Sequence, residues 1–277
     1  MLRKPEPILV ADRFQPLLEA LLELLESLGE EDWRRPVHGG EWTVKDLAQH
    51  LLGDEIGILS GKRDRYAGES APPPVWEGLV GWINRRNALW VEATRRMSPR
   101  LICELLRTTG EAANAFFLTL DPFAAGVPVH WAGTEPAPVW LDIAREFTER
   151  WHHQQHIREA TGRPGAAGPE FLAPVLEAFV HALPVAYREV QAPEGTAVSL
   201  AVRGEAGGVW AAVREGQRWE LYRGSPEQPA AQVELDEGSA WRLFTRGLSR
   251  EEARSRAKLS GDAALAEKAL EMVSILA

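Results

Sequence analysis

Residues 42–51 read WTVKDLAQHL, and this stretch carries a start signal for a helix. Thr43 offers a hydroxyl cap and Asp46 follows three positions later, which is the arrangement of a capping box. We expect the helix to begin at Thr43 and to run to about Gly61. His50 lies between two leucines of this segment, so it falls on or near the face that turns toward the core.

Apolar residues recur at helical spacing on both sides of this segment, between residues 11 and 190. In the earliest part, Phe14, Leu17, Leu21 and Leu25 form one stripe, and glutamates lie off it. Further helices are expected at residues 14–28, 75–96, 100–120, 139–160 and 170–190, with a Pro- and Gly-rich loop at 121–138. These segments favour a helical bundle.

The period of the pattern changes from 3.6 to 2 after residue 195. Strands are expected at residues 197–203, 209–213, 219–222 and 231–235, and helices at 239–245, 250–258 and 262–275. The fold class predicted is therefore mainly α followed by α+β. We expect a four-helix bundle at residues 1–168, and a linking helix with a small α+β domain at residues 169–277.

The composition excludes several classes of function. The 277 residues carry a net charge of −9, so the chain lacks the positive field that attracts nucleic acid or an anionic membrane surface. Cys103 is the single cysteine, which excludes an internal disulfide framework and any metal site built from several thiolates. Histidines and carboxylates must therefore carry any chemistry.

The longest apolar stretches are interrupted by glutamate within a few residues, far short of the roughly 20 apolar positions of a membrane helix. The first residues, MLRKPE, lack the apolar core and the cleavage site of a secretory signal. We expect a cytoplasmic protein with no membrane partner, either a monomer or a homodimer.

Three of the seven histidines crowd into residues 149–156, which read ERWHHQQH. On a helix, Glu149 and His153 form one i, i+4 pair, and His152 and His156 form another. Two ligands at this spacing can reach a single metal ion, and spacing alone does not choose between the pairs. His50 could supply a third ligand from a facing helix. A core histidine and a solvated polar helix face are the alternatives.

Residues 42–51 resemble the signature of the DinB-like, or DinB/YfiT, metal-binding helical bundles, especially the N-terminal domain of mycothiol-dependent maleylpyruvate isomerases. Residues 149–158, with Gly-Arg-Pro at 162–164, are similar to the second half of that signature. The resemblance implies His50, Glu149 and His153 as metal ligands, and a C-terminal domain with a sterol-carrier-protein-like (SCP2-like) fold. Two departures stand out: the chain has Gln-Gln-His at 154–156 where the family has an Arg, Trp, Asp run, and Arg246-Gly247 where it has Gly-Arg.

Two imidazoles and one carboxylate leave coordination positions open on a divalent cation. Zinc suits these ligands best, and nickel or iron is also compatible. Cys103 is expected to fill space between leucines, so a thiol would come from a small cosubstrate. The resemblance implies a low-molecular-weight thiol, of the mycothiol or bacillithiol type, that attacks an electrophilic substrate in an isomerisation or an S-transfer. A metal-dependent hydrolase and a non-catalytic, metal-stabilised protein that binds a lipid or another small molecule are the alternatives.

Four further residues are candidates for the site. Asp54 could orient His50, and His156 could act as an outer partner or a proton carrier. His130 could line the mouth of a pocket, and Arg246 could bind a substrate carboxylate. For each of them, a surface or packing role is the alternative.

Overall fold

The computed structural model describes residues 1–37, 42–66, 68, 76–133 and 136–274. Their elements confirm the expected class, helices first and a sheet with helices afterwards. The chain forms two compact units: a helical unit of residues 9–122 and 146–167, and a sheet unit of residues 1–8, 123–145 and 168 onward. The division at residue 168 into two domains stays a prediction, and the sheet unit also includes two earlier segments.

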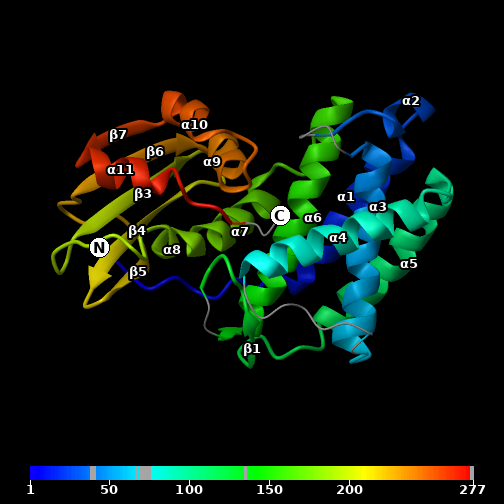
Figure 1. Ribbon diagram of the computed structural model, residues 1–277, viewed down its shortest axis with the longest axis horizontal. Coiled ribbons are helices and arrows are strands. Elements are labelled where there is room, and N and C mark those ends of the chain that lie inside the picture. Colours follow the sequence, from blue (N-terminus) through cyan, green and yellow to red (C-terminus); the bar gives the residue numbers. More distant parts are fainter. Residues whose placement is uncertain (38–41, 67, 69–75, 134–135, 275–277) are drawn as a thin grey trace. The chain divides into compact units, whose positions relative to one another are not determined.

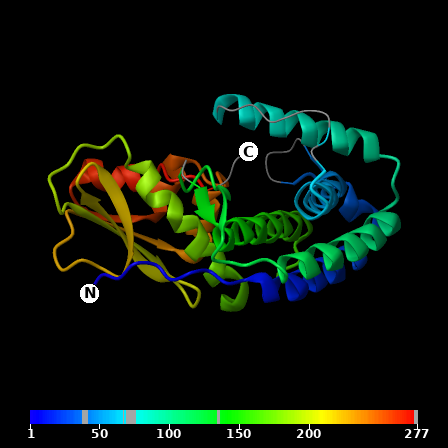
Figure 2. The same ribbon diagram turned by 90° about the horizontal axis from the view of Figure 1, so that it is seen from below.

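The helical unit is built from five long helices, and each is expected from the apolar pattern (Figure 1). They are α1 (Phe14–Glu26), α3 (Val44–Gly57), α4 (Trp76–Thr94), α5 (Pro99–Phe117) and α6 (Val139–Thr161, of which this unit contains the part from Glu146), with the short η1 (Ala11–Arg13) and α2 (Glu30–Trp33). Helix α5 packs on α1 and α3, and Figure 2 shows α4 at the edge of this unit beside α3. The leucine stripe of α1 is buried in the core between them.

The start of α3 is the capping box that its sequence predicts. The Thr43 amide donates to Asp46 Oδ2 at 3.0 Å, and the Asp46 amide donates to Thr43 Oγ1 at 3.3 Å. These bonds satisfy amides that the first turn leaves without helical partners. At Ile58 the helix continues as a π-helical turn, η2 (Ile58–Arg63), so the helical path extends slightly past the expected end.

A buried ion-pair network joins α6 to α3. Arg150 Nε donates to Glu55 Oε1 at 2.7 Å, and Arg150 Nη1 donates to the Glu146 carbonyl at 2.7 Å and to Glu146 Oε2 at 3.2 Å. The guanidinium also lies over the rings of Phe14 and Phe117. Burial disfavours its charge, but Glu55 and Glu146 outweigh burial and raise the Arg150 pKa. The network fixes the rotation of α6 against α3.

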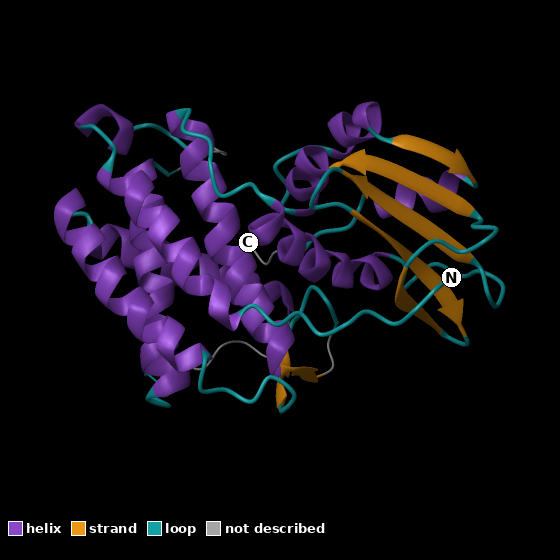
Figure 3. Ribbon diagram, turned by 180° about the vertical axis from the view of Figure 1, so that it is seen from behind, coloured by secondary structure: helices purple, strands orange, loops and turns teal. Residues whose placement is uncertain are grey.

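The sheet unit contains a five-stranded sheet in the order β5-β4-β3-β6-β7, in which β3 and β6 are parallel and the other neighbours antiparallel (Figure 3). The strands are β3 (Ala197–Arg203), β4 (Gly208–Glu215), β5 (Arg218–Arg223), β6 (Ala231–Asp236) and β7 (Lys258–Gly261). Helices α9 (Glu237–Phe244) and α11 (Ala263–Ala269) pack on it, and α10 (Arg250–Arg256) packs on α9.

Three expected elements differ in the structure. The loop at 121–138 contains a small antiparallel pair, β1 (Ala125–Pro128) and β2 (Pro136–Pro138). The helix expected at 170–190 is divided into α7 (Pro169–Phe179), η3 (Val180–Ala182) and α8 (Leu183–Ala186), where Pro184 cannot donate a helical hydrogen bond. The segment expected to be helical up to residue 258 ends at Arg256, because the next residues pair with β6 as β7.

One helical stretch, Pro169–Ala186, has the length and mean hydropathy (1.2) of a membrane span. Half of it is buried inside the protein, and a core helix passes the same test of length and composition.

Candidate metal centre

Helices α3 and α6 bring together the three residues that the family resemblance implies as ligands. His50 Nε2 lies 3.2 Å from His153 Nε2, and His153 Nε2 lies 3.2 Å from Glu149 Oε2. The three ligand atoms all lie within 4.8 Å of one another. Glu149 and His153 share one face of α6 because they are one helical turn apart, and His50 reaches them from α3.

The spacing of these atoms fits a divalent transition metal. With Zn–N bonds of about 2.05 Å and a tetrahedral angle, two ligand nitrogens stand roughly 3.3 Å apart, close to the separation of the His50 and His153 nitrogens. Burial, with His50 beside it, lowers the pKa of His153 well below its ordinary value, which favours the neutral ring that a metal requires. The donor set therefore suits zinc, and nickel or iron in the same way.

Asp54 lies near the ring nitrogen of His50 that faces His153. Its Oδ2 is 3.4 Å from His50 Nε2, the same nitrogen that faces His153. A residue that orients a metal-bound imidazole normally contacts the other ring nitrogen. Asp54 therefore lies beside the ligand atom of His50, and its predicted role in orienting that ring stays a prediction. Burial raises its pKa to about 6, with His50 opposing the rise and Glu149 adding to it.

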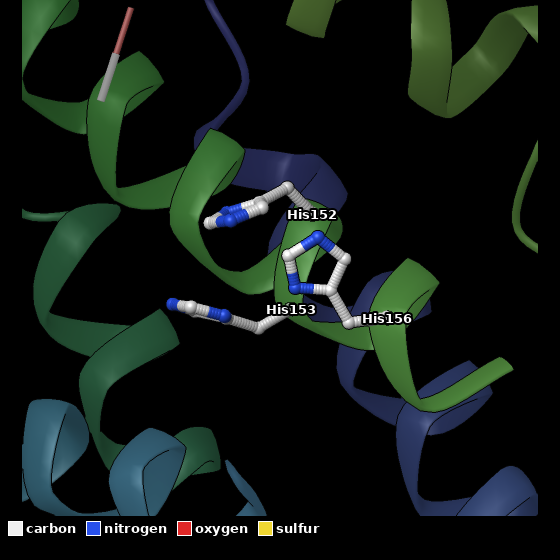
Figure 4. Close-up of side chains that lie close together, drawn as sticks. All are labelled: His152, His153 and His156. Carbon is white, nitrogen blue, oxygen red and sulfur yellow. The ribbon is translucent and has the colours of Figure 1, made fainter. Parts of the chain in front are cut away.

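The second i, i+4 pair lies on the same helix, next to the first. The rings of His152 and His156 have centroids 4.8 Å apart, and the His152 ring lies 4.1 Å from that of His153 (Figure 4). The three rings also offer ligand atoms within 4.8 Å of one another. Both pairs that spacing leaves open are therefore present, and the two groups of possible ligands, His50/Glu149/His153 and His152/His153/His156, have His153 in common.

The remaining candidates belong to the sheet unit. His130 is half-buried, and Arg246 is exposed just after α9 with a φ of +60°. Their predicted pocket and carboxylate roles stay predictions. The sequence analysis did not predict the ion pair of Arg150 with Glu55. The i, i+4 spacing of Glu146 and Arg150 could have indicated the other ion pair of this network.

Cys103 is buried within the helical unit. Burial, together with the nearby Glu26, raises the pKa of this thiol to about 11, so it stays protonated at neutral pH. An inert, buried cysteine agrees with the expectation that the chain supplies no reactive thiol of its own.

Comparisons with known proteins give the family and the fold of the chain. The family profile described as the mycothiol maleylpyruvate isomerase N-terminal domain matches residues 14–158, which include all three candidate ligands. Two solved structures share the fold, each covering 92% of this chain and 95% of its own: the mycothiol-dependent maleylpyruvate isomerase (13% identity, TM-score 0.52) and a histidine-to-alanine variant of it (12% identity, TM-score 0.52). The search of curated proteins gave no match. The chain belongs to the mycothiol maleylpyruvate isomerase N-terminal domain family.

Proposed function

We propose that the protein is a divalent-metal-dependent enzyme that uses a low-molecular-weight thiol, of the mycothiol or bacillithiol type, to isomerise an electrophilic substrate or to form an S-conjugate with it. The observation that carries the proposal is the convergence of His50, Glu149 and His153 in a chain of this family. A maleylpyruvate-like substrate, with a carbon–carbon double bond next to a carbonyl, has the electrophilic carbon that such a thiol attacks.

The chain's own residues would hold and orient the reacting groups. His50 Nε2, His153 Nε2 and Glu149 Oε2 would ligate the cation, and the Arg150 network would keep α6 in the register that this requires. When bound, a divalent cation with an open position lowers the pKa of a thiol and favours its thiolate near neutral pH. Asp54 Oδ2, 3.4 Å from His50 Nε2, would accept a hydrogen bond from the incoming thiol.

The reaction balances without another reagent. The thiolate sulfur forms a bond to one carbon of the double bond, and the π electrons move toward the neighbouring carbonyl. Rotation about the resulting single bond, followed by cleavage of the carbon–sulfur bond, restores the double bond in the other geometry and returns the thiol. If the carbon takes up a proton before the sulfur leaves, the product is the S-conjugate.

The buried Cys103 supports the use of an external thiol, because it is the only cysteine of the chain. We also propose a cytoplasmic location, where such thiols are kept reduced.

The test is a turnover assay with the zinc-loaded protein, maleylpyruvate, and mycothiol or bacillithiol, followed by chromatography of substrate, thiol and product. Catalytic conversion with the thiol recovered indicates an isomerase, and consumption of one thiol per product indicates an S-transferase. Both activities should be lost in Glu149→Gln and kept in Cys103→Ala, with the folding of each variant checked by circular dichroism.

Two outcomes contradict the proposal. Turnover that is the same without any thiol assigns the site to metal-dependent hydrolysis. No conversion with either thiol, in protein that holds its metal, leaves the site as a stabilising one in a binding protein.

A further inference from the structure

The histidine cluster of α6 contains more ligand nitrogens than one metal centre uses. His152 is only 3% exposed, and its Nδ1 has no hydrogen-bond partner in the described part of the chain. The same holds for Nδ1 of His153. Burying a ring nitrogen without a hydrogen-bond partner is unfavourable, so two such nitrogens side by side call for a ligand that satisfies both.

His153 has only one nitrogen left for such a ligand. Its Nε2 faces His50 and Glu149, at 3.2 Å from each of their ligand atoms. Figure 4 shows one ring nitrogen of His153 at the tip of the ring, pointing away from His156, and the other near the base of the ring. A metal-bound histidine usually donates its second N–H to a carboxylate or a carbonyl. Here two further imidazoles lie beside the ring instead.

We propose that His152, His156 and Nδ1 of His153 form a second metal site, so that His153 bridges two divalent transition metal ions through its two ring nitrogens. His152 and His156 are an i, i+4 pair with rings inclined at 80°, and the ligand atoms of the three residues lie within 4.8 Å of one another. Three imidazoles form a donor set for zinc, copper or nickel.

Binding of the second ion requires the loss of one proton from His153. A neutral His153 with Nε2 on the first ion carries its proton on Nδ1, and binding of the second ion releases that proton to solvent. The ring then carries a negative charge between two cations.

The two sites can be tested separately, because the second depends on the first only through His153 and not on the proposed thiol chemistry. The full-length protein is stripped with a chelator, saturated with Zn²⁺, desalted and analysed for zinc per chain. We expect two zinc ions in the wild type, and one in His156→Ala and in His50→Ala. His130→Ala, a matched histidine variant in the sheet unit, should keep two.

A Co²⁺ titration provides the second readout. The visible absorption of the wild type should rise in two steps, and His156→Ala should keep the first step and lose the second, with affinity for the second ion at least about tenfold weaker. His156 is half-buried, so this variant is expected to fold, and His156→Gln with a thermal unfolding scan provides the check.

One zinc ion in the wild type overturns the proposal, and so does retention of two ions by folded His156→Ala. If the wild type holds one zinc ion, and His50→Ala loses it while His156→Ala keeps it, the first centre is supported and the second is removed. The metal analysis does not measure thiol turnover, so its result is independent of the result of the enzyme assay.

Discussion

Replacement of Arg150 by methionine should strongly destabilise the helical unit. Methionine keeps most of the length of the side chain but removes the partner of Glu55 and one partner of Glu146. Glu146 keeps Lys62, 3.0 Å away, so most of the cost falls on Glu55. Breaking a buried pair from one side costs about 3–5 kcal/mol, because the remaining carboxylate has lost its water as well as its partner. We expect a loss in this range.

The assay is urea unfolding of the metal-free protein, followed by circular dichroism at 222 nm. The double variant Arg150→Met/Glu55→Gln removes the carboxylate charge that Arg150→Met leaves unpaired. It should recover a substantial part of the lost free energy of unfolding, and a double-mutant cycle measures the coupling between the two residues. Arg100→Met is the matched control, since Arg100 pairs with Glu104 on the surface and should change stability little. A loss below about 1 kcal/mol for Arg150→Met, or no coupling to Glu55, would show that this buried ion pair does not stabilise the helical unit.

Three further predictions concern single side chains. Thr43→Ala removes the cap of α3 and should cost about 1 kcal/mol in urea unfolding, while Thr108→Ala in mid-helix should cost much less. Tyr187→Phe removes the hydrogen bond to the Leu265 carbonyl (2.6 Å) and should cost about 1–3 kcal/mol; an unchanged unfolding midpoint would show that water replaces it. Burial lowers the pKa of His181 from 6.5 to about 4. Between these two pH values the unfolded state therefore binds a proton that the folded state does not. This contribution is constant well above pH 6.5 and should fall by about 3 kcal/mol as the pH drops to about 4; His181→Phe should flatten that part of the stability profile, and an equal slope in both proteins would contradict the assignment.

The sequence predicts well the elements that local signals specify, such as caps and apolar periodicity. Helix α3 has a capping box and an apolar face, and α6 has a long periodic pattern that ends at Gly162. The strand β7 was missed because residues 258–261 are few and mostly exposed, and they become a strand only by pairing with β6. Tertiary pairing overrides the local pattern there.

The sequence also predicts part of the candidate site. Spacing along α6 reveals the pairs Glu149/His153 and His152/His156, but it cannot show which one faces His50, because that depends on how α6 packs against α3. The contact of Arg150 with Glu55, which sets this packing, joins residues 95 positions apart. No local pattern carries such information.

The packing of α3 against α6 leads us to propose that His50, Glu149 and His153 ligate one metal ion. Crystals of the zinc-loaded protein, measured on both sides of the zinc absorption edge, test it most directly. We expect an anomalous peak about 2.0–2.2 Å from His50 Nε2, His153 Nε2 and Glu149 Oε2. A zinc-saturated crystal with no peak among these three atoms, or with one bound only by His152 and His156, would contradict it.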